Sequence, residues 1–143
     1  LERALLLEVL PMRSARPEPD LEAVPRALER LYGAGLHPDW WKLPPQRDPA
    51  VWREIDRVIT AHDPDCHGIL VLGMGASAAD LADRFAGARG ASRRVRGFVV
   101  GRTIFGAPAD AWLHARVDDQ GLVEGVATAF AEVVAAWRGE SMP

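Results

Sequence analysis

The chain is short of three features that mark common classes of protein: cysteine, lysine and long apolar runs. Its 143 residues are enough for one domain with one core. The single cysteine, Cys66, excludes an intramolecular disulfide framework and fits a reducing compartment, so we expect a cytoplasmic protein. No apolar run approaches membrane-spanning length, and the first residues lack a signal-peptide pattern. The start at Leu1 rather than methionine predicts processing, or a fragment of a larger chain.

An excess of positive charge is absent as well. The net charge is −3, and no basic stripe with interleaved aromatic residues occurs, which argues against a nucleic-acid-binding protein. Arg93, Arg94 and Arg96 form a short cluster before an apolar run, a pattern typical of a solvated loop. We therefore expect neither nucleic acid nor a membrane among the partners of this chain.

Lysine is the scarcest charged residue. Of the 17 lysines and arginines, only Lys42 is a lysine, and it lies in an apolar segment with Trp41 and Leu43. An arginine cannot lose its proton in a protein, whereas a desolvated lysine can become a neutral amine that attacks a carbonyl. Lys42 is therefore the first candidate for chemistry. The alternative is that its stem packs while its ammonium reaches water.

One organisation is repeated four times along the chain. A short apolar run is followed by a cluster of turn residues and then by a segment of helical period. The apolar runs are 4–10, 40–43, 69–72 and 97–100. Their starts are about thirty residues apart, the length of a strand with its crossover helix.

The helices have readable starts. We expect them at Asp20, at Asp48 with Pro49, at Ser77 with Asp80, at Pro108 for a short helix through His114, and near Asp119. The apolar face of the first carries Leu21, Val24, Leu28 and Leu31. The last carries a stripe that we predict to be core: Val123, Val126, Phe130, Val133 and Trp137.

Strands that alternate with helices predict an α/β fold with a parallel sheet and right-handed crossovers. Four β/α units form either a small open sheet or half of an eight-stranded barrel. A whole (β/α)8 barrel typically needs about 250 residues, so this chain is too short for one. We expect residues 1–143 to form a single domain.

The C-terminal ends of the strands are where parallel α/β folds bind ligands. Side chains alternate along a strand, so Trp41 and Leu43 share one face while Lys42 lies on the other. If Trp41 and Leu43 pack against helices, Lys42 points to the opposite, inner side of the sheet, near the C-terminal ends of the strands. By the same alternation, Glu8 lies on one face at the end of the first run.

The last two strand ends have the residues of an anion site. Gly73 and Gly75 allow a tight turn and close backbone approach, and Ser77 starts a helix whose free amides favour negative charge. Gly101 is followed by Arg102, whose planar guanidinium suits a phosphate. We therefore expect a phosphate site here. The alternative is that each glycine only serves its own turn.

Other motifs are weak. His62, Cys66 and His67 fall in a helix-to-strand loop away from the C-terminal ends of the strands, and no fourth ligand is evident, so we expect no metal. The nucleotide-binding glycine fingerprint is incomplete at Gly73 and Gly75, and we expect no cofactor.

Several stretches resemble the DUF2090 family. They are residues 38–43 with Asp-Trp-Trp-Lys, 68–75, 97–106 with Gly-Arg-Thr-Ile-Phe-Gly, and 111–113. That domain is found as the C-terminal part of bacterial 5-dehydro-2-deoxygluconokinase fusion proteins of myo-inositol catabolism. It is similar to tagatose-bisphosphate aldolases with a class I mechanism. The resemblance covers nearly the whole chain and corresponds to strands 5 to 8 of a TIM barrel.

The resemblance implies a function for these residues. Lys42 matches the lysine that forms a Schiff base in similar aldolases, and Glu8 looks like the carboxylate that shuttles protons. Gly101 and Arg102 match the phosphate-binding turn, with Gly73 and Gly75 beside it. The implied substrate is 5-dehydro-2-deoxygluconate 6-phosphate, cleaved to dihydroxyacetone phosphate and malonate semialdehyde.

Two alternatives stay open beside the aldolase. Glu8 also fits an exposed or paired strand carboxylate, and Pro44 stands where similar sequences often have an acidic residue. The chain also fits a noncatalytic phosphate-binding or structural domain, fused to or partnering a carbohydrate kinase. In either case, a missing segment or a second half-barrel completes the sheet, or the chain is a stable fragment.

Overall fold

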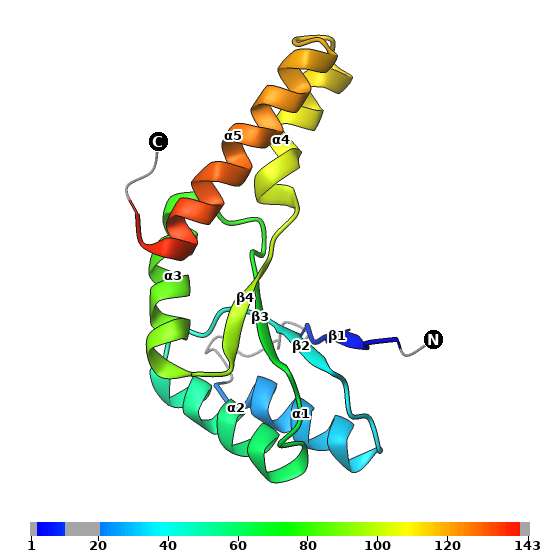
Figure 1. Cartoon of the computed structure of the whole chain (residues 1–143), viewed down its shortest axis with the longest axis vertical. Helices are drawn as coiled ribbons and strands as arrows, with labels where there is room; N and C mark the ends of the chain where they lie inside the picture. Colours follow the sequence, from blue (N-terminus) through cyan, green and yellow to red (C-terminus); the bar gives the residue numbers. More distant parts are fainter. Residues whose placement is uncertain (1–2, 11–20, 141–143) are drawn as a thin grey trace.

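The computed structural model describes residues 3–10 and 21–140 of the chain. Within them, four parallel strands form one sheet in the order β1-β2-β3-β4 (Figure 1). The strands are β1 (Leu6–Glu8), β2 (Trp40–Leu43), β3 (Gly68–Leu72) and β4 (Val95–Val99). The helices are α1 (Ala23–Gly33), α2 (Pro49–His62), α3 (Ala78–Ala91), α4 (Arg102–Leu113) and α5 (Asp119–Arg138). The predicted α/β class with a parallel sheet is confirmed.

Side-chain caps begin two of the helices where the sequence predicts them. The amide of Ala50 donates to Asp48 Oδ1 at 2.8 Å at the start of α2, and the amide of Asp80 donates to Ser77 Oγ at 3.1 Å at the start of α3. The predicted cap Asp20 lies outside the described residues. Leu21 was expected on the buried face of α1, but it precedes the helix and is 49% exposed.

Helices α1, α2 and α3 all cover the same face of the sheet (Figure 1). Trp41 and Leu43 of β2 lie beneath them and are fully buried, as are Ile69 and Val71 of β3. The opposite face carries no helix among the described elements, and Val99 there is 37% exposed. The period-two alternation of the strands therefore separates a packed face from an open one.

The prediction that a short helix begins at Pro108 is wrong. Helix α4 begins at Arg102, directly after Gly101, and Pro108 lies inside it. Proline favours a first turn, which suggested the later start, but in a helix interior it removes one backbone hydrogen bond. The Pro108 ring packs closely against α5, since a Cβ on Gly125 would be 3.2 Å from it.

Helix α5 begins at Asp119 as predicted, but its apolar stripe is only partly core. Val133 is fully buried, whereas Val123 and Phe130 are 66% and 51% exposed. The helices α4 and α5 form a hairpin that projects from the sheet, and only the C-terminal part of α5 lies on α3 (Figure 1). In the projecting part, α4 is the only described neighbour of α5. No helix in the described ranges is both long and apolar enough to cross a membrane.

A buried hydrogen bond supports β2 from its packed face. The indole Nε1 of Trp41 donates to the hydroxyl of Tyr32 at 2.7 Å, and the two residues are 0% and 4% exposed. Their rings also meet edge to face, with centroids 5.4 Å apart. Trp41 precedes Lys42, so this contact helps to set which face of β2 turns toward the open side.

We expect Tyr32→Phe to lower the free energy of unfolding by about 1–3 kcal/mol, because the buried Trp41 indole then has no acceptor. Urea titrations of both proteins would measure this loss. An unchanged midpoint would mean that another group or water satisfies the indole.

The same tyrosine predicts a loss of stability in alkali. Burial raises the pKa of Tyr32 from about 10 to about 12, so the folded state holds the proton more tightly than the unfolded chain. The stabilisation is complete below about pH 10 and is lost as the pH rises toward about 12. Tyr32→Phe should lack this part of the pH dependence in unfolding titrations between these two values.

Candidate functional site

Glu8 and Lys42 lie side by side at the ends of neighbouring strands. They are direct register partners of β1 and β2, so their side chains leave the same face of the sheet. The ammonium Nζ of Lys42 donates to Glu8 Oε2 at 2.7 Å, which makes a close ion pair. A lysine and a carboxylate at this distance can exchange a proton directly.

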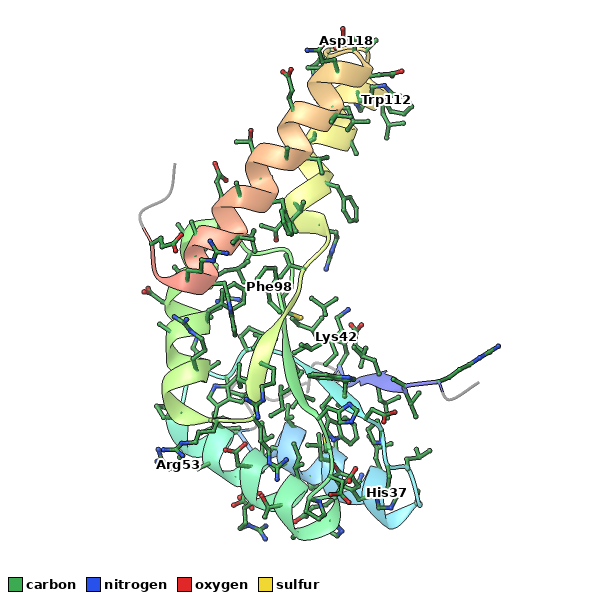
Figure 2. The ribbon with its side chains drawn as sticks, viewed as in Figure 1. His37, Lys42, Arg53, Phe98, Trp112 and Asp118 are labelled. Carbon is green, nitrogen blue, oxygen red and sulfur yellow. The ribbon has the colours of Figure 1, made fainter. Side chains whose placement is uncertain are left out.

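Lys42 is on the open side of the sheet, away from α2 and α3 (Figure 2). Its side chain is only 17% exposed, while that of Glu8 is 37% exposed. Most of the Lys42 side chain is therefore screened from water, and a ligand can still reach its amine from the open side. Trp41, the preceding residue, points into the packed face, as the alternation of β2 requires.

A cavity of about 300 Å³ lies at the C-terminal ends of the strands. All six candidate site residues line it: Glu8, Lys42, Gly73, Gly75, Gly101 and Arg102. The remaining lining residues are Leu10, Leu72, Met74, Val99, Val100, Thr103 and Phe105. One opening thus contains the only lysine of the chain, its carboxylate partner and both glycine turns.

The loop after β3 is a tight turn over residues 73–76. The amide of Ala76 donates to the carbonyl of Gly73 at 3.1 Å, and the two residues between them have positive φ angles, 56° at Met74 and 74° at Gly75. Two consecutive left-handed residues are typical of a type I′ turn. At Gly73 a Cβ would lie 2.8 Å from Val100 Cγ1, so the turn packs directly against the end of β4.

The helix N-terminus at the cavity is that of α4, not that of α3. Ser77, expected to supply free amides, does not line the cavity, and its hydroxyl and the Asp80 carboxylate are bonded to each other at 2.9 Å. In contrast, Gly101 at the start of α4 has no side chain to cap the helix. Gly101, Arg102 and Thr103 line the cavity, so the N-terminal end of α4, whose partial positive charge stabilises an anion, lies at its wall.

Arg102 adds a full positive charge at this position. Its guanidinium lies over the glycine turn, since a Cβ at Gly75 would be 3.8 Å from Arg102 Cζ. In the parts of the chain that the structure describes, it makes no ion pair or hydrogen bond. An unpaired guanidinium beside a helix N-terminus and a glycine turn has the chemistry of a phosphate or carboxylate site.

Comparison with known proteins agrees with the sequence resemblance. The sequence model of a family described as "Uncharacterized protein conserved in bacteria (DUF2090)" matches residues 1–141. The chain belongs to the DUF2090 family. No curated protein matches it.

The sequence of this DUF2090 chain did not predict seven of the residues that line the cavity. Two of them, Met74 and Thr103, directly follow predicted site residues. The stretch Gly101-Arg102-Thr103 immediately after a strand was the available signal for Thr103. The positive φ of Met74 had none, because a methionine does not favour that conformation.

The histidines and the cysteine of the DUF2090 chain have other contacts. His62 stacks on Tyr32 with ring centroids 5.2 Å apart, and His67 meets Trp40 edge to face at 5.5 Å. Cys66 is buried, and burial raises the pKa of its thiol, which disfavours the thiolate that a metal needs. Residues 3–10 and 21–140 contain no cluster of three metal-ligating side chains.

Proposed function

We propose that this domain is a class I aldolase that acts on a phosphorylated keto sugar acid. The substrate that the family resemblance implies is 5-dehydro-2-deoxygluconate 6-phosphate, in the cytoplasmic breakdown of myo-inositol. The observation that carries the proposal is the shared cavity, where the Lys42–Glu8 pair and the anion-binding groups around Arg102 line one opening of about 300 Å³. An amine near an anion site suits a ketone that carries a phosphate.

The first chemical step needs a neutral amine. Glu8, whose Oε2 is 2.7 Å from Nζ, accepts the proton of Lys42 as substrate enters. The amine then adds to the ketone, and loss of water leaves an iminium. The phosphate meanwhile is held by Arg102 and by the first amides of α4, which fixes the ketone relative to Nζ.

Carbon–carbon cleavage follows at the iminium. The bond between the α carbon and the hydroxylated β carbon breaks, and its electron pair forms the double bond of an enamine as the iminium nitrogen becomes neutral. The β-hydroxyl gives its proton to a base, so the β carbon leaves as the aldehyde. Malonate semialdehyde leaves first. A proton returned to the enamine carbon and one water then release dihydroxyacetone phosphate and the free amine. Glu8 is the described carboxylate nearest to Nζ and takes the acid/base role.

We propose further that the four β/α units are the second half of a TIM barrel, strands 5 to 8. In support, each strand lies beside the next one in sequence, and α1 to α3 cover only one face. A doubly wound sheet would reverse its strand order and have helices on both faces. The open face, which carries Glu8 and Lys42, corresponds to the interior of a barrel. A missing segment or a second half-barrel would cover it.

A noncatalytic phosphate-binding domain that partners a carbohydrate kinase is the second candidate. Its support is that the anion-binding groups at Gly75, Gly101 and Arg102 are complete without Lys42. For this candidate, loss of the Lys42 amine would leave phosphate affinity and kinase output unchanged.

Reductive trapping tests the aldolase. Borohydride added to the full-length protein with saturating dihydroxyacetone phosphate should reduce the Schiff base and add a stable mass to Lys42, located by peptide mass spectrometry. Inorganic phosphate in excess should protect Lys42, because it competes for the anion site. Lys42 without added mass under saturating ligand would contradict the aldolase and favour the binding domain.

A further inference from the structure

One hydrogen bond joins the two loops that form the anion-binding part of the cavity. The hydroxyl of Thr103 donates to the carbonyl oxygen of Ala76 at 2.7 Å, between residues 27 positions apart in the chain. Ala76 closes the glycine turn after β3, and Thr103 is the second residue of α4. The bond is partly buried, so water competes with it only in part.

The glycine turn needs support from outside. Met74 has a φ of 56°, a left-handed conformation that methionine disfavours. Its side chain is 52% exposed, so burial of that side chain does not stabilise this conformation. Such conformations persist only where the surroundings impose them. The described contacts that do so are the bond inside the turn, the packing of Gly73 on Val100, and the Thr103 hydroxyl.

The start of α4 depends on the same bond. Gly101 provides no side-chain cap, so no hydrogen bond from its own residue orients the first turn. Because Thr103 follows Arg102 directly, a tie at Thr103 sets where the guanidinium and the first amides of α4 lie relative to Gly75. The Thr103 side chain thus joins the two halves of the anion site by a hydrogen bond, beside the packing of Gly73 on Val100.

We propose that Thr103 is the positioning residue of the anion site, and that it fixes the two loops at the spacing a phosphate monoester requires. The inference rests on the proposed function, since it concerns the same phosphate. Thr103 acts through Arg102 and the turn rather than on the reacting carbonyl. Loss of the Thr103 hydroxyl should therefore weaken the binding of ligands that carry a phosphate and leave the binding of other ligands unchanged.

The test uses the full-length protein with Thr103→Val, which keeps the shape and removes the hydroxyl, and Thr103→Ser, which keeps the hydroxyl. Calorimetric titration with inorganic phosphate should show affinity lowered by about fivefold to tenfold in Thr103→Val, the scale of one hydrogen bond. Thr103→Ser should bind within about twofold of the wild type. If Thr103→Val does not fold, Thr103→Ala takes its place and should show the same loss of phosphate affinity.

Trapping with borohydride separates positioning from a general structural role. In Thr103→Val, half-maximal trapping of dihydroxyacetone phosphate should need a higher concentration, while trapping of dihydroxyacetone, which lacks the phosphate, should be unchanged. Equal losses for both ligands, or wild-type phosphate affinity in Thr103→Val, would overturn the inference.

The two proposals fail in different ways. If the wild type binds phosphate but traps no ketone, the aldolase fails, and the phosphate titrations alone still decide the role of Thr103. If the wild type binds no phosphate, both proposals fail.

Discussion

Lys42→Arg is expected to reduce aldol cleavage by about 10⁴-fold or more, the scale on which an enzyme loses its nucleophile. Arginine keeps the positive charge and the length to reach Glu8, but it does not lose its proton and forms no Schiff base. The ion pair at the end of β2 therefore survives while the chemistry does not. Release of dihydroxyacetone phosphate by the full-length protein, followed in a coupled assay, would measure the loss.

The control for Lys42→Arg is phosphate binding, because the anion-binding groups come from the loops after β3 and β4. Inorganic phosphate should bind the variant within a few-fold of the wild type, and the urea midpoint should hardly move. Cleavage that persists at a tenth or more of the wild-type rate would show that Lys42 is not the nucleophile.

Glu8→Gln should lower kcat by about 10²–10⁴-fold, the usual contribution of general acid–base catalysis. The glutamine oxygen still accepts a hydrogen bond from Nζ, so Lys42 keeps its place, but an amide does not take up the proton. Borohydride trapping should still label Lys42, at a lower rate. The comparison of steady-state rates with the rate of trapping separates proton transfer from binding.

Glu124→Gln provides the matched control. Glu124 lies on the projecting part of α5, is exposed, and pairs only with Gln120 among the described residues, at 2.8 Å. The same change of charge there should leave kcat unaltered. If Glu8→Gln behaves like Glu124→Gln, Glu8 is a structural partner of Lys42, and another group moves the proton.

The local parts of the fold were readable because short-range chemistry determines them. Strand β2 has the predicted bounds, since apolar Trp41 and Leu43 alternate with Lys42 and two prolines follow the strand. Asp48 and Ser77 cap helices because their side chains reach amides two or three residues ahead. Period and capping depend on near neighbours, so one sequence is enough to find them.

The candidate site was only partly readable. Alternation and parallel pairing bring Glu8 and Lys42 to one strand end, but their 2.7 Å contact depends on the register of β1 with β2. Helix α4 starts at Arg102 and contains Pro108, so the proline signal placed the start of this helix too late. The exposure of Phe130 follows from the hairpin standing away from the sheet, and no stripe of apolar residues reveals that.

By itself, the sequence determined the parallel α/β class, the two faces of β2 and the residue types of the site, because periodicity and residue chemistry act over a few positions. Only the tertiary structure decided that α4 rather than α3 presents its N-terminus to the cavity, and that Thr103 ties its two loops together. Those features join segments 27 residues apart, and a contact of that span depends on how whole elements pack.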